Sequence, residues 1–364
     1  MSGATVRTLV VLRPGVLEIV EEPEPPLADG RFRARTLFTG MSAGTELAWY
    51  RGTSPHLTAG WDPELGLFDR GRPAQSFPVR HLGYMEVARV THSRTPAVAE
   101  GAVVAMAYGH STVVHGDPVT QHVVHLPPGL DPLLGIYAAH LGPICANGLL
   151  HAADDAGGAE LSSGVRGRLV LVVGGGTIGL LVGLLARVHG AAEVVVLDPT
   201  EQRRRAAVGL GLQAVDDTPD VARDLKTRWR HGAADHGADV VFQCRGEASA
   251  LATALRCLRP QGTVVDLAFY TEGADAVALG QEFHHNGLSV RCAQIGRVPR
   301  RLAACWDRRR LSHETLELLC HQGPQIREHV LTDVVPFDRA PALFAELSER
   351  RRHVLSAALE VPHG

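Results

Sequence analysis

The alternation of apolar and polar residues predicts a β-rich first part of the chain. Short alternating stretches, separated by turns rich in Pro, Gly and Asp, run to about residue 130. In the clearest of them, Arg31 to Phe38, apolar and basic side chains alternate as in a strand with one buried face. The other predicted strands are residues 7–11, 16–20, 86–90, 102–106 and 122–126. Residues 54–80 hold many Pro and Gly with little periodicity, so we expect a long surface loop or lobe there.

After Pro128 the pattern changes to an alternation of strands and helices. Residues 131–153 have helical spacing, and from Gly167 short apolar runs alternate with amphipathic segments. The predicted strands are 168–173, 194–197, 239–242 and 263–267, with helices at 178–189 and from Glu201. This βαβ rhythm is typical of a doubly wound parallel sheet, to which residues 289–295 can add an edge strand. The tail from Arg301 reads as helical and ends in a strand at 353–361.

Length and charge narrow the class of protein. The 364 residues fit two domains. The net charge of -3 and the absence of a basic arm argue against nucleic-acid binding. No uncharged apolar stretch reaches the roughly 20 residues of a membrane span, and no secretory segment precedes the first strand. The six cysteines show no paired spacing, which indicates reduced thiols. We therefore expect a cytoplasmic protein with a small-molecule substrate.

Lysine is nearly missing from the chain. Lys226 is the single lysine, and it lies in a polar pattern typical of an exposed helix. This argues against any mechanism that needs a buried lysine, such as a Schiff base or a Tyr-x-x-x-Lys proton relay. Short-chain reductases are excluded on this ground.

A glycine motif marks the expected cofactor site. Residues 174–179 read Gly-Gly-Gly-Thr-Ile-Gly, follow a buried-strand run and open a helix, which is the context that G-x-G-x-x-G requires. Gly174 would allow the tight turn, Gly176 would let the backbone approach a pyrophosphate, and Gly179 would let helix and strand pack closely. The helix start at Thr177 and Ile178 would offer its free N–H groups to the phosphates.

The rest of the cofactor site follows from the ends of the strands. Asp198 ends the strand after the motif, where a carboxylate would bind the adenosine ribose hydroxyls and repel a 2′-phosphate, so NAD is favoured over NADP. Arg203 can lie against the adenine, or accommodate a 2′-phosphate. Near the nicotinamide half we expect the loops that contain Cys244, Arg245, Phe269 and Tyr270. Cys244 is more simply interpreted as a small buried side chain.

A β-rich first part, a dinucleotide fold and a short returning segment resemble the medium-chain dehydrogenase/reductase superfamily. The resemblance covers nearly the whole chain, and its specific marks are residues 39–46 (TGMSAGTE), residues 82–87 (LGYMEV) and the glycine motif with Asp198. It implies an α/β protein with a GroES-like β-rich catalytic domain at 1–150 and 298–364. A Rossmann NAD-binding domain would span 151–297, and the resemblance also implies a homodimer paired through the strand at 289–295.

The sequence departs from the zinc-dependent members of that superfamily at every ligand. Their ligand cysteine falls here on Ser42 or Ala43, and their ligand histidine on Tyr84. The third ligand falls near residues 142–143, two residues before Cys145, and no cysteine precedes Cys145 to build a structural zinc lobe. Neutral hydroxyls are poor zinc ligands. The sequence therefore predicts no metal, and it is more similar to the zinc-lacking branch that includes bacteriochlorophyllide dehydrogenases.

Without a metal, a side chain must polarise the substrate carbonyl and move a proton. Our hypothesis is that Tyr84 donates a hydrogen bond to the substrate oxygen, that Thr45 and Ser42 continue the proton path, and that Glu46 orients this group. Tyr84 can equally be a structural residue whose hydroxyl satisfies a backbone carbonyl. Among the histidines, His140, one helical turn before Ile144, is the candidate base, although a structural role is the simpler interpretation.

The leading functional prediction is reversible, NAD-dependent oxidation of a secondary alcohol to a ketone. Two alternatives remain at the level of the sequence. Some zinc-free relatives reduce enones, usually with NADPH, and a non-catalytic NAD(H)-binding subunit would use Tyr84 only structurally.

Overall fold

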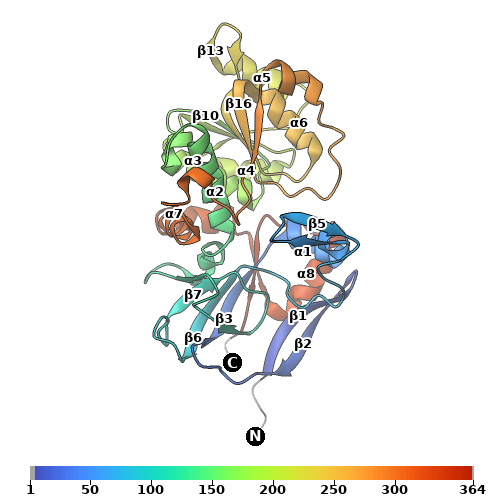
Figure 1. The fold of residues 1–364 in the computed structure, drawn as a ribbon, viewed down its shortest axis with the longest axis vertical. Coiled ribbons are helices and arrows are strands. Elements are labelled where there is room, and N and C mark those ends of the chain that lie inside the picture. Colours follow the sequence, from blue (N-terminus) through green and yellow to red (C-terminus); the bar gives the residue numbers. More distant parts are fainter. Residues whose placement is uncertain (1–4, 363–364) are drawn as a thin grey trace. The chain divides into compact units, whose positions relative to one another are not determined.

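The computed structural model describes residues 5–362 and separates into two compact units. The first unit is Met1–His140 together with Leu331–Gly364, and the second is Leu141–Val330. Figure 1 shows the chain leaving the first unit, building the whole of the second, and returning to the first. Each unit has its own sheet and its own core.

The first unit is built on an antiparallel sheet. Its strands follow the order β18-β19-β3-β6-β7-β9, with β8 also paired to β3, and β1 and β2 form a separate hairpin. The strands are β1 (Thr5–Arg13), β2 (Val16–Pro23), β3 (Phe32–Met41), β4 (Ala59–Asp62), β5 (Leu67–Arg70), β6 (Glu86–Ser93), β7 (Val103–Met106), β8 (Val113–Gly116), β9 (Val123–His125), β18 (Asp333–Pro336) and β19 (Ala357–Glu360). The helices are α1 (Ala43–Arg51) and α8 (Ala340–Ser348), with short helical turns η1 (Pro55–Leu57), η2 (Pro132–Tyr137) and η6 (Phe337–Arg339).

Helices α1 and α8 cover the apolar side of the β1–β2 hairpin. Leu9, Val11 and Leu17 of the hairpin share one buried cluster with Tyr50 of α1 and Phe344 of α8. A second cluster fills the space between β3, β6, β7 and β8. The first cluster also contains Met41 and Leu47, so the end of β3 and helix α1 pack together in one core.

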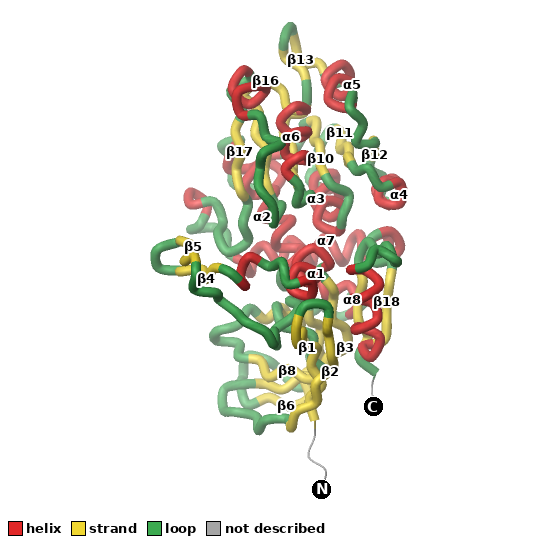
Figure 2. Tube along the Cα trace, turned by 90° about the vertical axis from the view of Figure 1, so that its right-hand side faces the viewer, coloured by secondary structure: helices red, strands yellow, loops and turns green. Residues whose placement is uncertain are grey.

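Residues 54–80 are less featureless than their composition indicates. They contain a two-stranded hairpin, β4–β5, in addition to η1. Figure 2 shows this hairpin projecting from the other strands of its unit. Trp61 packs edge-on against Phe68 at 5.1 Å between ring centroids, yet each side chain is about half exposed.

The second unit contains a six-stranded parallel sheet in the order β12-β11-β10-β15-β16-β17. Its strands are β10 (Leu169–Val173), β11 (Glu193–Leu197), β12 (Gln213–Val215), β15 (Ala238–Gln243), β16 (Leu258–Asp266) and β17 (Ser289–Cys292), with a small hairpin β13 (Arg230–Gly232) and β14 (Asp235–His236). The helices are α2 (Leu141–Asp155), α3 (Thr177–Val188), α4 (Glu201–Gly209), α5 (Val221–Arg228), α6 (Ala248–Cys257) and α7 (Arg308–His329), with turns η3 (Leu161–Gly164), η4 (Leu279–Phe283) and η5 (Arg300–Leu302).

Helices cover both faces of this sheet, since successive residues of its central strands are buried. Side chains of successive strand residues point to opposite faces. Leu171 and Val173 pack in one cluster with residues of α5 and α6. On the other face, a Cβ at Gly179 of α3 would contact Val172, and one at Gly148 of α2 would contact Leu267. The predicted fold class, a β-rich domain with a Rossmann-like parallel sheet, is confirmed.

The boundaries between the units differ from those expected from the sequence. Residues 141–150 and 298–330 lie in the second unit, whereas the sequence placed them with the first. The reason is packing around α2: Trp306 donates to the Ala159 carbonyl at 2.7 Å, and Arg301 pairs with Asp154 at 2.8 Å. The predicted helix at 131–153 is two elements, η2 and α2.

Two further expectations concern the edge of the sheet and the membrane. The predicted edge strand exists as β17 at one end of the parallel sheet. Across residues 5–362, no helix has the length and apolar character needed to cross a bilayer.

Candidate functional site

The glycine loop after β10 has the geometry of a phosphate-binding turn. Gly174 adopts φ of 102°, a backbone conformation that disfavours side chains. A Cβ at Gly179 would lie 1.8 Å from the Gly174 carbonyl oxygen, so only glycine allows α3 to begin so close to the turn. A Cβ at Gly176 would meet nothing within 4 Å. The loop is therefore closed at Gly179 and open at Gly176, where a phosphate could approach the N-terminus of the 12-residue helix α3.

Asp198 is locked against this loop. Its carboxylate accepts hydrogen bonds from the Gly175 N–H and the Thr200 N–H, both at 2.8 Å, and the side chain is fully buried. Arg203 pairs with the same carboxylate at 3.3 Å and is itself partly exposed. The structure thus brings together Asp198, Arg203 and the glycine loop, as the sequence placed them.

The loops after β15 and β16 carry the other cofactor candidates. Arg245 pairs with Asp217 at 3.2 Å and with Glu247 at 2.7 Å. Phe269 is half exposed. Burial raises the pKa of the Cys244 thiol well above its usual value, so Cys244 stays protonated at neutral pH.

Tyr270 lies in a hydrogen-bonded group at the ends of two strands. Its hydroxyl donates to Asp266 at 3.0 Å and receives a hydrogen bond from the Gln243 amide at 3.2 Å. Gln243 belongs to the segment that the sequence placed near the nicotinamide half, whereas Asp266 was not predicted.

In the first unit, the predicted catalytic hydroxyls form one cluster. The Tyr84 hydroxyl donates to the Ser42 hydroxyl in a close contact and lies 3.5 Å from the Thr45 hydroxyl. Ser42 and Thr45 flank the first turn of α1, while Tyr84 comes from the loop that leads into β6. Burial raises the pKa of Tyr84, and the nearby Glu46 carboxylate raises it further. The Tyr84 hydroxyl is therefore protonated at neutral pH and can donate a hydrogen bond.

His140 lies beside this cluster. Its ring meets the Tyr84 ring edge-on, with centroids 4.7 Å apart and planes inclined at 60°. The contact fixes the plane of the Tyr84 ring and brings a titratable group next to the hydroxyl cluster.

Glu46 links the cluster to a buried histidine. One carboxylate oxygen accepts the Ser42 N–H at 2.8 Å, and the other is 2.8 Å from Nε2 of His110. Nδ1 of His110 is 2.8 Å from the Thr39 hydroxyl. Glu46, His110 and Thr39 are almost wholly buried. This buried network therefore fixes the position of the first turn of α1 and of the Ser42 backbone.

Gly83 explains why this arrangement is tight. It adopts φ of 94°, and a Cβ there would lie 2.8 Å from Nε2 of His110. The glycine before Tyr84 thus leaves room for the His110 ring. Gly83, which precedes Tyr84, thus packs directly against the Glu46–His110 pair.

Two residues beyond Tyr84, Glu86 is a fully buried carboxyl. The Thr36 hydroxyl is in close contact with Oε1 of Glu86 and 2.6 Å from the Ser111 carbonyl. A hydroxyl has one proton and a carbonyl can only accept, so the contact with Glu86 requires a proton on the carboxyl. Oε2 of Glu86 has no partner, and burial raises the pKa of this group well above its usual value. Glu86 is therefore a neutral acid at neutral pH.

The donors at the expected zinc positions do not suit a metal. Hydroxyls of Ser42 and Tyr84 stand where zinc-dependent members have thiolate and imidazole, and the raised pKa of Tyr84 disfavours a phenolate ligand. Burial also raises the pKa of Cys145, whose Sγ donates to the Leu141 carbonyl at 3.3 Å. Among the described residues there is no group of three or more His, Cys, Asp or Glu side chains placed to hold a metal ion.

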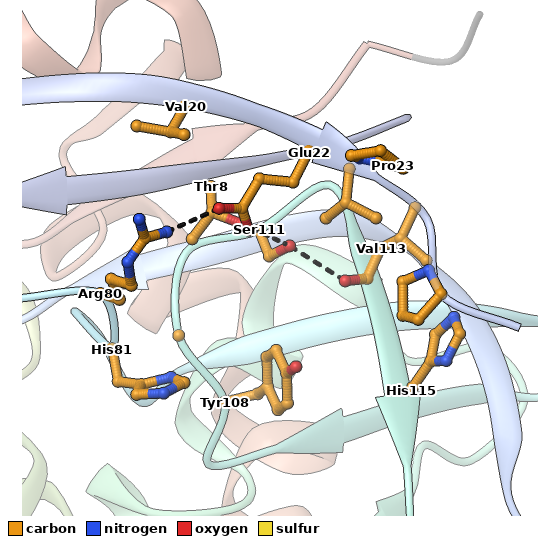
Figure 3. Close-up of a pocket in the computed structure, with 13 residues that line it drawn as sticks. Thr8, Val20, Glu22, Pro23, Arg80, His81, Tyr108, Ser111, Val113 and His115 are labelled. Atoms are coloured by element: carbon orange, nitrogen blue, oxygen red, sulfur yellow. Dashed lines mark hydrogen bonds and ion pairs between the residues drawn. The ribbon is translucent and has the colours of Figure 1, made fainter. Parts of the chain in front are cut away.

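A surface pocket lies elsewhere in the first unit, between the β1–β2 hairpin and the loop before β8 (Figure 3). Arg80 and Glu22 form an ion pair at 2.7 Å on its wall, and His81, Tyr108 and Ser111 also line it. None of the predicted catalytic residues is in its lining. The pocket and the Tyr84 cluster are therefore distinct features of the unit.

Sequence reasoning missed the roles of His110 and Asp266. His110 is one of 19 histidines in the sequence. Its role becomes visible only in the structure, where its ring packs directly against Gly83. Asp266 carries a recognisable signal, since it is an acidic residue at the end of an otherwise apolar run, at the edge of the sheet where ligands bind.

Comparison with known proteins agrees with this architecture. Residues 177–308 match the family model described as zinc-binding dehydrogenase. D-guloside 3-dehydrogenase of Shigella flexneri is 27% identical over 366 aligned positions, which cover 94% of this chain and 95% of that protein.

Solved structures share the fold over almost the whole chain. A candidate zinc-binding dehydrogenase from Sinorhizobium meliloti 1021, bound to NADP, superposes with a TM-score of 0.71 at 20% identity, covering 98% of this chain and 99% of that one. An alcohol dehydrogenase from Escherichia coli CFT073, in complex with NADH, gives a TM-score of 0.73 at 15% identity, covering 98% and 100%. In sequence and in fold the chain is thus similar to zinc-type dehydrogenases of the medium-chain superfamily, and it is an oxidoreductase.

Proposed function

We propose that this protein is an NAD-dependent dehydrogenase that interconverts a secondary alcohol and a ketone without a catalytic zinc ion. The observation that carries the proposal is the hydroxyl cluster of Tyr84, Ser42 and Thr45. The superfamily resemblance aligns Ser42 and Tyr84 with metal ligands of zinc-dependent members, and Thr45 with the hydroxyl of their proton relay. On this basis the chain belongs with the zinc-lacking members of its superfamily.

The cofactor part of the proposal depends on the second unit. The loop at Gly174–Gly179 fits a pyrophosphate because Gly176 is open and the α3 N-terminus is free of a side-chain cap. Asp198, at the end of β11, fits an adenosine ribose and disfavours a 2′-phosphate, which supports NAD over NADP. When bound, the nicotinamide ring accepts or supplies the hydride.

Tyr84 supplies the proton in this scheme. Its raised pKa keeps the hydroxyl protonated, so it can donate a hydrogen bond to a ketone oxygen and then transfer its proton as the alcohol forms. Ser42 and Thr45 are within reach to return a proton to Tyr84. Alcohol oxidation uses the same path in reverse. Glu46 holds the Ser42 backbone and acts as a positioning residue.

The full-length relative supports the substrate class. That protein is described as a D-guloside 3-dehydrogenase. We accordingly propose a small polyhydroxylated substrate, such as a glycoside or a polyol, with a secondary hydroxyl as the reacting group.

Replacing Tyr84 by phenylalanine tests the central assignment. We expect the variant to bind NADH as the wild type does, because Tyr84 is in the other unit from the glycine loop, and to lose on the order of 10²–10⁴-fold in kcat with a panel of glycosides and polyols. Tyr50→Phe is the matched control, since Tyr50 is buried and its hydroxyl donates to the Gly15 carbonyl at 2.9 Å, near the other end of α1 from Ser42.

Three results would overturn the proposal. Full turnover by Tyr84→Phe would remove Tyr84 from the chemistry. Stoichiometric zinc in the active wild-type protein would contradict the zinc-free mechanism. Absence of turnover with every alcohol and ketone, despite tight NADH binding, would favour a non-catalytic NAD(H)-binding subunit.

We also propose a homodimer paired along β17. Ser289 and Val290 are exposed on this edge strand of the parallel sheet. An exposed edge offers unpaired backbone groups to a second copy. A Val290→Pro variant that remains dimeric in sedimentation experiments would exclude this contact.

A further inference from the structure

The carboxyl ends of the parallel strands lie level with one another. The pairing register aligns Leu197 of β11, Val173 of β10, Gln243 of β15 and Asp266 of β16 in one row. Ligands of such sheets bind beyond this row. The pyrophosphate loop follows β10, and Asp198 marks the adenosine half on the β11 side. The other half of a bound dinucleotide would therefore lie on the side of β15 and β16, where Gln243 and Asp266 end their strands.

The hydrogen bonds at this end of the sheet have a fixed direction. The Arg245 N–H donates to Oε1 of Gln243 at 3.3 Å, and Nε2 of Gln243 donates to the Arg245 carbonyl at 2.7 Å. These two contacts set the orientation of the amide, so the contact with Tyr270 is a donation from Nε2. The Tyr270 proton must then point to Asp266, which it does at 3.0 Å.

Asp266 therefore acts as an acceptor at both oxygens. Oδ2 accepts from Tyr270, and Oδ1 accepts the Ala268 N–H at 2.9 Å. This is the bonding of a carboxylate. Burial raises the pKa of Asp266, and the two donors lower it in part. Among residues 5–362 no Arg, Lys or His forms an ion pair with Asp266, in contrast to Asp198, which is paired with Arg203.

A buried, unpaired negative charge distinguishes the two redox states of a nicotinamide. The oxidised ring carries a positive charge, and the reduced ring is neutral. A carboxylate next to the ring therefore stabilises the oxidised form selectively, and the effect is large where water is scarce. Asp266 is 8% exposed.

We propose that Asp266, held in place by Tyr270 and Gln243, is a specificity-determining residue that makes this protein bind oxidised NAD in preference to NADH. This inference rests on the proposed cofactor site and goes beyond it, because it assigns a redox preference to a side chain on the nicotinamide side of that site.

The test is a comparison of Asp266→Asn with the wild type at mildly alkaline pH. Dissociation constants for NAD and NADH are measured by calorimetry and by NADH fluorescence. Asparagine keeps the shape and can still accept from Tyr270, but it has no charge. We expect the ratio of the NADH constant to the NAD constant to fall on the order of tenfold, mainly through weaker NAD binding. Glu272→Gln is the matched control, since Glu272 is an exposed carboxylate two residues after Tyr270, and its ratio should equal that of the wild type.

Each outcome decides one question. An unchanged ratio in a folded Asp266→Asn protein refutes the inference and leaves the proposed function intact. A wild type that binds neither nucleotide refutes the proposed function itself. Should Asp266→Asn fail to fold, Asp266→Ser, which retains an acceptor in a smaller side chain, is measured in the same way and must show the same fall.

Discussion

Glu86 makes the stability of the first unit depend on pH, and replacing it by glutamine should remove that dependence. The buried carboxyl keeps its proton in the folded protein, whereas in the unfolded chain it ionises above its ordinary value of 4.5. Above that value the unfolded state binds fewer protons than the folded state, so stability falls as pH rises until the folded group itself ionises. Glutamine has the same shape and does not titrate.

The magnitude follows from the proton difference. Each pH unit between the unfolded and folded pKa values changes the free energy of unfolding by about 1.4 kcal/mol. Between about pH 5 and about pH 7 the advantage of Glu86→Gln over the wild type should therefore grow by up to about 2.7 kcal/mol. Any constant effect of the amide cancels in this comparison, including about 1–3 kcal/mol for its second, unpartnered N–H.

Urea unfolding at the two pH values measures this difference. With a urea slope of about 2–3 kcal/mol/M, the midpoint of the variant should gain about 1 M on the wild type between pH 5 and pH 7. Glu18→Gln, at an exposed position of β2, is the control and should follow the wild type. If the urea midpoints of the wild type and of Glu86→Gln shift equally between the two pH values, the Glu86 carboxyl is ionised or solvated in the folded protein. The assignment of a proton to this carboxyl beside Thr36 would then be wrong.

Two further predictions test the packing of the second unit and the state of the thiols. Gly179→Ala places a Cβ against the Gly174 carbonyl, which is backbone and cannot move aside, so NADH affinity should fall by tenfold or more; wild-type affinity in a fluorescence titration would disprove the closed geometry of the loop. Alkylation of the native protein followed by mass spectrometry should label the exposed thiols of Cys305 and Cys320. It should spare Cys145 and Cys257, because burial raises the pKa of Cys145 and raises that of Cys257 to about 12, and rapid labelling of either would show that the core opens.

The sequence predicts best what depends on local periodicity. The βαβ rhythm and the glycine loop were readable because a buried strand, a turn and a helix follow one another within 20 residues or so. The Tyr84 cluster was readable as a set of positions only through the superfamily resemblance. Its geometry, with Tyr84 donating to Ser42, depends on where β3 ends and β6 begins.

What could not be predicted depends on contacts between distant segments. The unit boundary shifts because Trp306 and Arg301 pack against residues near the end of α2, some 150 residues earlier in the chain. His110 meets Glu46 because a glycine at position 83 leaves space for its ring. The hairpin at 59–70 contains Pro-poor, apolar strands whose side chains remain exposed, so no burial pattern reveals them.

The level row of strand ends also bears on how cofactor preference can change by mutation. Asp198 follows β11 and Asp266 ends β16, so β10 and β15 lie between them. Three strand spacings amount to about 14 Å, beyond the range at which substitutions usually influence each other. Under the two proposed assignments, substitutions at the adenosine end and at the nicotinamide end should therefore have free-energy effects that add. Natural or laboratory evolution could then tune cofactor selectivity and redox preference separately, in either order.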